Sequence, residues 1–187
     1  ETFKDEDHVR VHSLVRKGGD VLNSVPDLVL MEEKVRAKTL EGIRDAKAKL
    51  DRAFDAAAFA FGGTIERENL QGYMPVLYRP ADSVLIEAAK QLGASYRVVK
   101  ETDFNNASTD VGDLTHLMPV VNFTFNGFEG KLHGADFRIT DPEKAYLIPA
   151  RMLALTTYKL LKNKALEGNK IIRDFVPQFD KESYIAY

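Results

Sequence analysis

The sequence predicts an α/β protein in two parts, a small α+β unit over residues 1–74 and part of a helix-covered mixed sheet over residues 75–187. Three observations predict this class. Segments with a period of two, rich in β-branched residues, alternate with segments whose apolar residues recur every three or four positions. A continuous apolar run in the second part is typical of a strand that is buried on both faces. The segment "GYMPVLYRP" is typical of a crossover between the two parts.

Two strands open the first part. In "HVRVHSLV", residues 8–15, β-branched residues alternate with other residues, as in a strand. The segment "DLVLMEEKVRAK", residues 27–38, begins with an apolar run and continues as an alternating pattern. Gly18 and Gly19 break the chain between them, because glycine readily adopts positive φ. We therefore expect two antiparallel strands joined by a loop.

An amphipathic helix follows, with Thr39 as its N-cap and Gly62 and Gly63 at its end. Residues 64–74 then predict a further strand. The order strand, strand, helix, strand is most of a helix layer on an antiparallel sheet, short by one strand and one helix. The apolar positions of the helix are Ile43, Ala46, Leu50, Ala53, Phe54, Ala57 and Phe61.

The second part predicts two helices and two strands. The helices are expected over residues 81–92 and 141–166, the second beginning at an aspartate followed by proline and bending near Pro149. The strands are expected at "SYRVVK", residues 95–100, and at the apolar run "MPVVNFTFN", residues 118–126. This pattern favours a mixed sheet covered by helices on both faces.

The composition disfavours several classes of function. The 26 Lys and Arg residues nearly balance the 28 Asp and Glu residues, so no net field attracts nucleic acid or an anionic membrane. The absence of cysteine excludes thiolate metal sites and cysteine nucleophiles within the chain. No segment matches a signal peptide or a membrane span, so we expect a cytoplasmic protein with no nucleic-acid or membrane partner. Because the chain begins at Glu1, we also expect it to be processed or truncated.

The four histidines are the first candidates for metal ligands. His8 and His12 would share one face of a helix, but the alternating pattern predicts a strand, which separates them by roughly 13 Å. That distance is too long for one ion. His116, in "DLTHLMP", precedes the predicted buried strand, and a hydrogen-bonded structural histidine is the favoured interpretation.

His133, in "GKLHGADF", leaves two interpretations open. Most lone histidines are not ligands, but this one follows an apolar strand and precedes a glycine, where α/β proteins usually place their sites. Zinc needs three or four protein ligands, and no pair within the chain has ligand spacing. If His133 binds a metal, the other ligands lie outside these residues.

Ordered motifs along the chain resemble the zinc-dependent aminoacylase and carboxypeptidase family, whose nearer members include p-aminobenzoyl-glutamate hydrolase and related dipeptidases. The stretch "VRVHSLVRKGGDVLNSVPDLVLMEEKVRA" is similar to the family's lid, in which a histidine strand, a glycine pair, an asparagine loop and a strand ending in Arg-Ala recur in this order. "NASTDVGDLTHLMP" is similar to the segment GSTDxGDVSxxxP, with Ala107 where glycine is usual, and "KLHGADF" occupies the place of the C-terminal metal-binding histidine. The resemblance spans about His8 to Leu161.

The resemblance implies an α/β catalytic domain sandwiched by helices and interrupted by a ferredoxin-like lid. Residues 1–74 would be most of that lid, and residues 75–187 the C-terminal part of the catalytic domain. The upstream half, with the remaining ligands and the glutamate general base, would be missing. The resemblance therefore implies no catalytic residue in this chain and no activity for the fragment alone.

For the site, the resemblance implies that His133 ligates one of two zinc ions, with manganese or cobalt as substitutes and Asp136 as a candidate acceptor for its other ring nitrogen. Asn23 and Arg36 match lid positions that contact substrate, and a guanidinium suits a carboxylate. The pocket would be lined by Ser108, Thr109 and Asp110.

The implied reaction is hydrolysis of the amide bond of an N-acyl amino acid or dipeptide by an enzyme that forms homodimers through the lid. Ser13 stands where the family usually has glycine, which leaves the substrate preference open. The alternative is an interaction module that dimerises by extending its sheet edge to edge and has no catalytic role.

Overall fold

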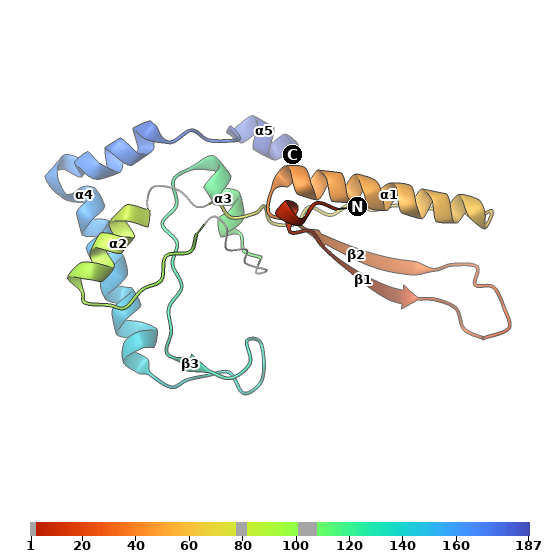
Figure 1. Ribbon diagram of the computed structural model, residues 1–187, viewed down its shortest axis with the longest axis horizontal. Coiled ribbons are helices and arrows are strands. Elements are labelled where there is room, and N and C mark those ends of the chain that lie inside the picture. Colours follow the sequence, from red (N-terminus) through yellow and green to blue (C-terminus); the bar gives the residue numbers. More distant parts are fainter. Residues whose placement is uncertain (1–2, 78–81, 101–107) are drawn as a thin grey trace. The chain divides into compact units, whose positions relative to one another are not determined.

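The structure is a computed structural model that describes residues 3–77, 82–100 and 108–187. It divides into two compact units. The first holds the described residues up to Pro75 together with Ser108, and the second holds the described residues from Val76 to Lys100 and from Thr109 to Tyr187. Both units combine helices with a small antiparallel sheet, so the predicted α/β class is confirmed (Figure 1).

The first unit is built on a long hairpin. After a short 3₁₀ helix, η1 (Asp5–Asp7), strand β1 (Arg10–Lys17) pairs antiparallel with β2 (Leu30–Arg36), as predicted (Figure 1). The Ser13 hydroxyl donates to Glu33 Oε2 at 2.6 Å, which ties one cross-strand pair together. Most side chains of both strands are exposed, so ladder hydrogen bonds and such pairs hold this hairpin.

Helix α1 (Leu40–Ala60) completes the unit and confirms the predicted helix. The Thr39 hydroxyl accepts the backbone N–H of Gly42 at 3.0 Å, as expected of an N-cap. Gly62, with φ of 69°, follows the last turn. The side chain of Ala46 is fully buried.

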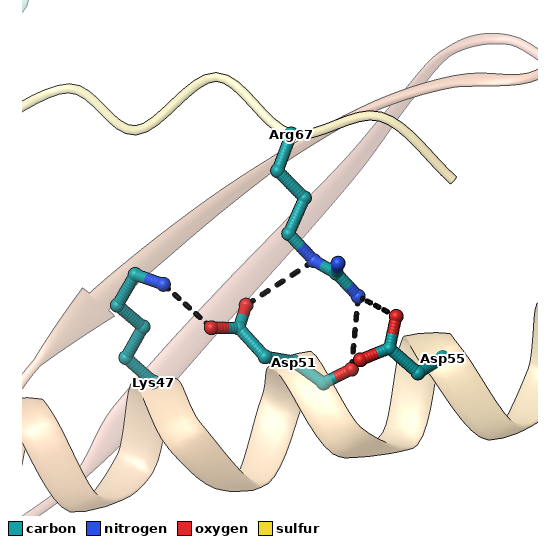
Figure 2. A network of polar contacts seen from close by, with 4 residues as sticks. All are labelled: Lys47, Asp51, Asp55 and Arg67. Carbon is teal, nitrogen blue, oxygen red and sulfur yellow. Dashed lines mark hydrogen bonds and ion pairs between the residues drawn. The ribbon is translucent and has the colours of Figure 1, made fainter.

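The prediction of a strand over residues 64–74 is wrong. This segment has no assigned secondary structure, because a strand needs a partner and no described residue pairs with it. Arg67 instead attaches it to α1, with Nη2 2.6 Å from Asp55 Oδ1 and Nε 3.4 Å from Asp51 Oδ1 (Figure 2). Arg67 Nη2 also donates to the backbone oxygen of Asp51 at 3.0 Å. The Asp51 carboxylate pairs in addition with Lys47, with Nζ 2.5 Å from Oδ2.

The second unit is mostly helical, and its core lies between two of its helices. Leu85, Ala88 and Ala89 on one helix pack with Met152 on the other. Its elements are α2 (Asp82–Gln91), α3 (Val111–Leu117), β3 (Phe128–Glu129), β4 (Arg138–Ile139), η2 (Glu143–Leu147), α4 (Ile148–Asp174) and α5 (Lys181–Ala186).

Neither strand predicted in the second unit forms. Residues 95–100 and 118–126 have no assigned secondary structure. Val121 and Phe123 pack against the α2–α4 core while Asn122 and Thr124 are exposed, so this segment buries one face and not both faces as the apolar run predicted. The backbone lacks the ladder, because no strand among the described residues lies beside these segments.

The last predicted helix is longer than expected and broken. A π-helical turn, η2, precedes α4, and Pro149 lies in the first turn of α4, where the missing N–H is not needed. The break lies further on, at Lys162–Ala165, where the last three residues of that segment have φ near +55° (Figure 1). None of the described helices is long and apolar enough to cross a lipid bilayer.

Candidate functional site

His133 lies in the turn that connects β3 and β4, and not directly after a buried strand as the sequence predicted. In this short hairpin Phe128 pairs with Ile139 and Glu129 with Arg138. His133 is exposed and has φ of 64°, a conformation that costs a residue with a Cβ atom and that the surrounding turn must impose.

The turn around His133 is fixed by backbone contacts. The Asp136 carboxylate accepts the N–H of Lys131 at 3.2 and 3.3 Å, and the Gly134 N–H donates to the Lys131 oxygen at 2.7 Å. A Cβ atom on Gly130, which has φ of 96°, would collide with the carbonyl group of Asp136. Asp136, expected to accept a hydrogen bond from His133, therefore holds the Lys131 backbone in this structure.

Stacked aromatic side chains support the base of the same hairpin. Phe128 and Phe137 stack at 5.3 Å between ring centroids, and Phe125 contacts Phe128 at 5.6 Å. Aromatic pairs of this kind stabilise a structure by about 0.5–1.5 kcal/mol beyond the area that they bury. The turn that carries His133 thus stands on a supported hairpin.

Thr109 and Asp110 begin α3. The Thr109 hydroxyl accepts the Val111 N–H at 3.3 Å and donates to Asp110 Oδ1 at 3.2 Å, while the Thr109 carbonyl accepts the Gly112 N–H at 3.0 Å. Asp110 and the preceding Ser108 are exposed. The part of the predicted motif at residues 106 and 107 lies outside the described residues.

The structure does not bring Asn23 and Arg36 together. Asn23 is exposed in the turn between β1 and β2, whereas Arg36 is the last residue of β2, half-buried and opposite Arg10. The six-residue rise from Leu30 to Arg36 alone amounts to roughly 20 Å, so the two side chains lie at opposite ends of the hairpin.

The other histidines have structural surroundings. His12 lies in β1 opposite Lys34, and His8, with φ of 48°, follows η1. The side chain of His116 is only 1% exposed, and its Nδ1 lies 2.7 Å from Oε1 of Gln178. The favoured interpretation of His116 as a hydrogen-bonded structural residue is confirmed.

A second long-range contact to α3 was not foreseen from the sequence. The hydroxyl of Tyr184 donates to Asp113 Oδ1 at 3.1 Å, and this bond to a carboxylate raises the pKa of the tyrosine. No local pattern marks the pair, because the two residues lie 71 positions apart.

No group of three or more histidine and carboxylate side chains within the described ranges is close enough to hold a metal ion. A cavity of about 290 Å³ in the first unit is lined by residues 3–5 and 8–10 and contains none of the predicted site residues. Among the described residues, His12 and His133 have exposed imidazoles, but neither belongs to a complete set of metal ligands.

Comparison with known proteins finds similarity to two dipeptidases. The mouse (Mus musculus) Xaa-Arg dipeptidase is 26% identical over 163 residues, which cover 84% of this chain and 37% of the mouse protein. The human (Homo sapiens) Xaa-Arg dipeptidase is 27% identical over 188 aligned positions, which cover 94% of this chain and 42% of the human protein. The chain thus spans less than half the length of these relatives. No protein-family model and no solved structure matches it.

Proposed function

We propose that this chain is the C-terminal part of a two-zinc hydrolase that cleaves the amide bond of a dipeptide or an N-acyl amino acid. The observation that carries the proposal is the similarity to a dipeptidase along 94% of the chain. The ordered motifs of the same stretch support it, because they resemble a zinc-dependent family of amide hydrolases. The upstream part of the protein would supply the remaining ligands and the general base.

In this proposal His133 is a metal ligand. Its imidazole is exposed on a turn that glycines and the Asp136 carboxylate hold in place, and it has no hydrogen bond to any other described residue. A histidine that neither packs nor bonds, and whose backbone is held at positive φ, is well suited to bind a ligand. When bound, two zinc ions, or manganese or cobalt in their place, supply an activated water and a polarised carbonyl.

Arg36 would hold the substrate carboxylate with two parallel hydrogen bonds. An extended dipeptide is only about 7 Å long, so it cannot reach both Arg36 and Asn23 of one copy. We assign the carboxylate to Arg36 because its half-buried position strengthens a charge-assisted bond. Asn23 then contacts another substrate molecule or another copy of the chain, and Ser108, Thr109 and Asp110 offer polar groups to the pocket.

One observation favours the alternative, an interaction module. The hairpin exposes a run of large apolar side chains, which a second copy of the lid would cover in a homodimer: Leu14, Val15, Leu28, Val29, Leu30 and Met31. Dimerisation is compatible with both functions. Metal content and hydrolysis separate them.

The test uses the full-length protein that contains this chain, with its zinc content measured by elemental analysis and its activity measured on an Xaa-Arg dipeptide and an N-acyl amino acid. The hydrolase should hold about two zinc ions per subunit. His133→Ala should lower the zinc content and should lower kcat by orders of magnitude. His12→Ala is the matched control and should retain both. A cytoplasmic homodimer without zinc or hydrolysis would establish the interaction module instead.

A further inference from the structure

Helix α3 is too short to be stable by itself. It has seven residues, whereas isolated helices below about 12 residues are marginal in water. It nevertheless begins directly after Thr109 and Asp110, two residues of the proposed pocket, and the first of them bonds to Val111 and Gly112 in its first turn. Any displacement of α3 therefore displaces the pocket residues.

The C-terminal segment, residues 175–187, holds the last turn of α3. The His116 carbonyl accepts N–H groups from Gln178 at 2.9 Å and from Phe179 at 3.4 Å. The His116 ring meets the Gln178 amide oxygen, and it lies 6.0 Å from the ring of Phe179. These contacts attach the end of α3 through both backbone and side chains.

The same segment reaches the first turn of α3 through Tyr184. Its hydroxyl bonds to the half-buried Asp113, and its place is set by α5, where Asp180 and Ser183 form a reciprocal cap. The Asp180 carboxylate accepts the Ser183 N–H at 2.7 Å, and the Ser183 hydroxyl accepts the Asp180 N–H at 3.0 Å. Tyr184 therefore sits on a rigid turn.

We propose that Tyr184 is a positioning residue that, through Asp113, holds α3 and thereby sets the place of Thr109 and Asp110 in the substrate pocket. The role in substrate binding rests on the proposed function, whereas the hold on α3 does not. Tyr184 itself contacts neither substrate nor metal in the proposed arrangement. Its hydroxyl acts through the helix.

The test is amide hydrogen exchange of the full-length protein, read at residues 109–117, with the first arm of α4, residues 148–161, as internal reference. Tyr184→Phe keeps the ring and removes one hydrogen bond, so exchange in α3 should rise about fivefold while exchange in the reference arm stays unchanged. Tyr158→Phe, on an exposed face of α4, is the matched control and should behave as the wild type. Equal exchange in wild type and Tyr184→Phe, or an equal rise in both regions, overturns the proposal.

Substitutions of Asp113 provide the rescue. Asp113→Ala should reproduce the rise at residues 109–117, whereas Asp113→Asn retains an acceptor oxygen and should stay within about twofold of wild type. In an active enzyme, KM for an Xaa-Arg dipeptide should rise with Tyr184→Phe and Asp113→Ala but not with Asp113→Asn. Faster exchange with an unchanged KM overturns the link to the pocket, while a wild type without hydrolysis overturns the proposed function alone.

Discussion

The Nδ1 atom of His116 lies 2.7 Å from Oε1 of Gln178 although 62 positions separate the two residues. The imidazole is almost completely buried, so water cannot replace this partner. Because an amide oxygen can only accept a hydrogen bond, Nδ1 is the donor in this contact. The contact thus couples the C-terminal segment to α3.

Gln178→Ala should lower the free energy of unfolding by about 1–3 kcal/mol, because it leaves a buried N–H without its partner. Urea denaturation followed by circular dichroism measures the change. Gln91→Ala, at the exposed end of α2, should stay within about 0.5 kcal/mol of wild type. Equal stability of the two variants would show that the His116 contact is dispensable.

The sequence predicts an element best when the residues that determine it lie within the element itself. The helix α1 follows from its apolar spacing, the Thr39 cap and the closing glycines, all of which lie within the element. The hairpin of β1 and β2 follows for a similar reason, because its two strands are near in sequence. Local signals were sufficient for these elements.

The features that the sequence predicts wrongly or does not reveal depend on residues elsewhere in the chain. Residues 118–126 have the apolar run of a buried strand, but a strand forms only when a ladder partner lies beside it, and the sequence pattern does not reveal whether one is present. The bond between Tyr184 and Asp113 joins residues 71 apart without any periodic signal. His133 was located by its motif, but its place in a hairpin turn depends on Gly130 and Asp136.

Arg67→Met should release residues 64–74 from α1, because the guanidinium is their bridge to Asp51 and Asp55. The pairs are partly exposed, so we expect a loss of only about 1 kcal/mol, smaller still in high salt. Proteolytic cleavage should accelerate within residues 64–74 more than within α1. Arg52→Met, exposed on the same helix, is the control, and an equal response to both substitutions would contradict a specific role of Arg67.

Acid should weaken the start of the α4 region through Asp141. Bonds from the Lys144 side chain and backbone lower the pKa of this carboxyl group, with the Nζ–Oδ2 pair at 2.7 Å. A group whose pKa is lowered on folding contributes stability above its unfolded pKa of about 3.9 and loses it as the pH falls through the folded value. Asp141→Asn should therefore flatten the dependence of unfolding free energy on pH between about pH 5 and pH 2. An unaltered slope, matching that of the loop variant Asp20→Asn, would argue against this contribution.

In the proposed hydrolase, Arg36→Ala should lower kcat/KM about a hundredfold on a dipeptide with a free C-terminal carboxylate, because one partner of a charge-assisted pair is removed. Arg36→Lys keeps the charge but loses the two parallel bonds, so its loss should be intermediate. The deciding comparison is a dipeptide whose C-terminus is an amide, on which wild type and Arg36→Ala should differ little, since no carboxylate is present to bind. Arg52→Ala controls for a general change in charge on the same unit. A hundredfold loss on both substrates would show that Arg36 supports the structure of the first unit, and no loss on either would remove it from the proposed site.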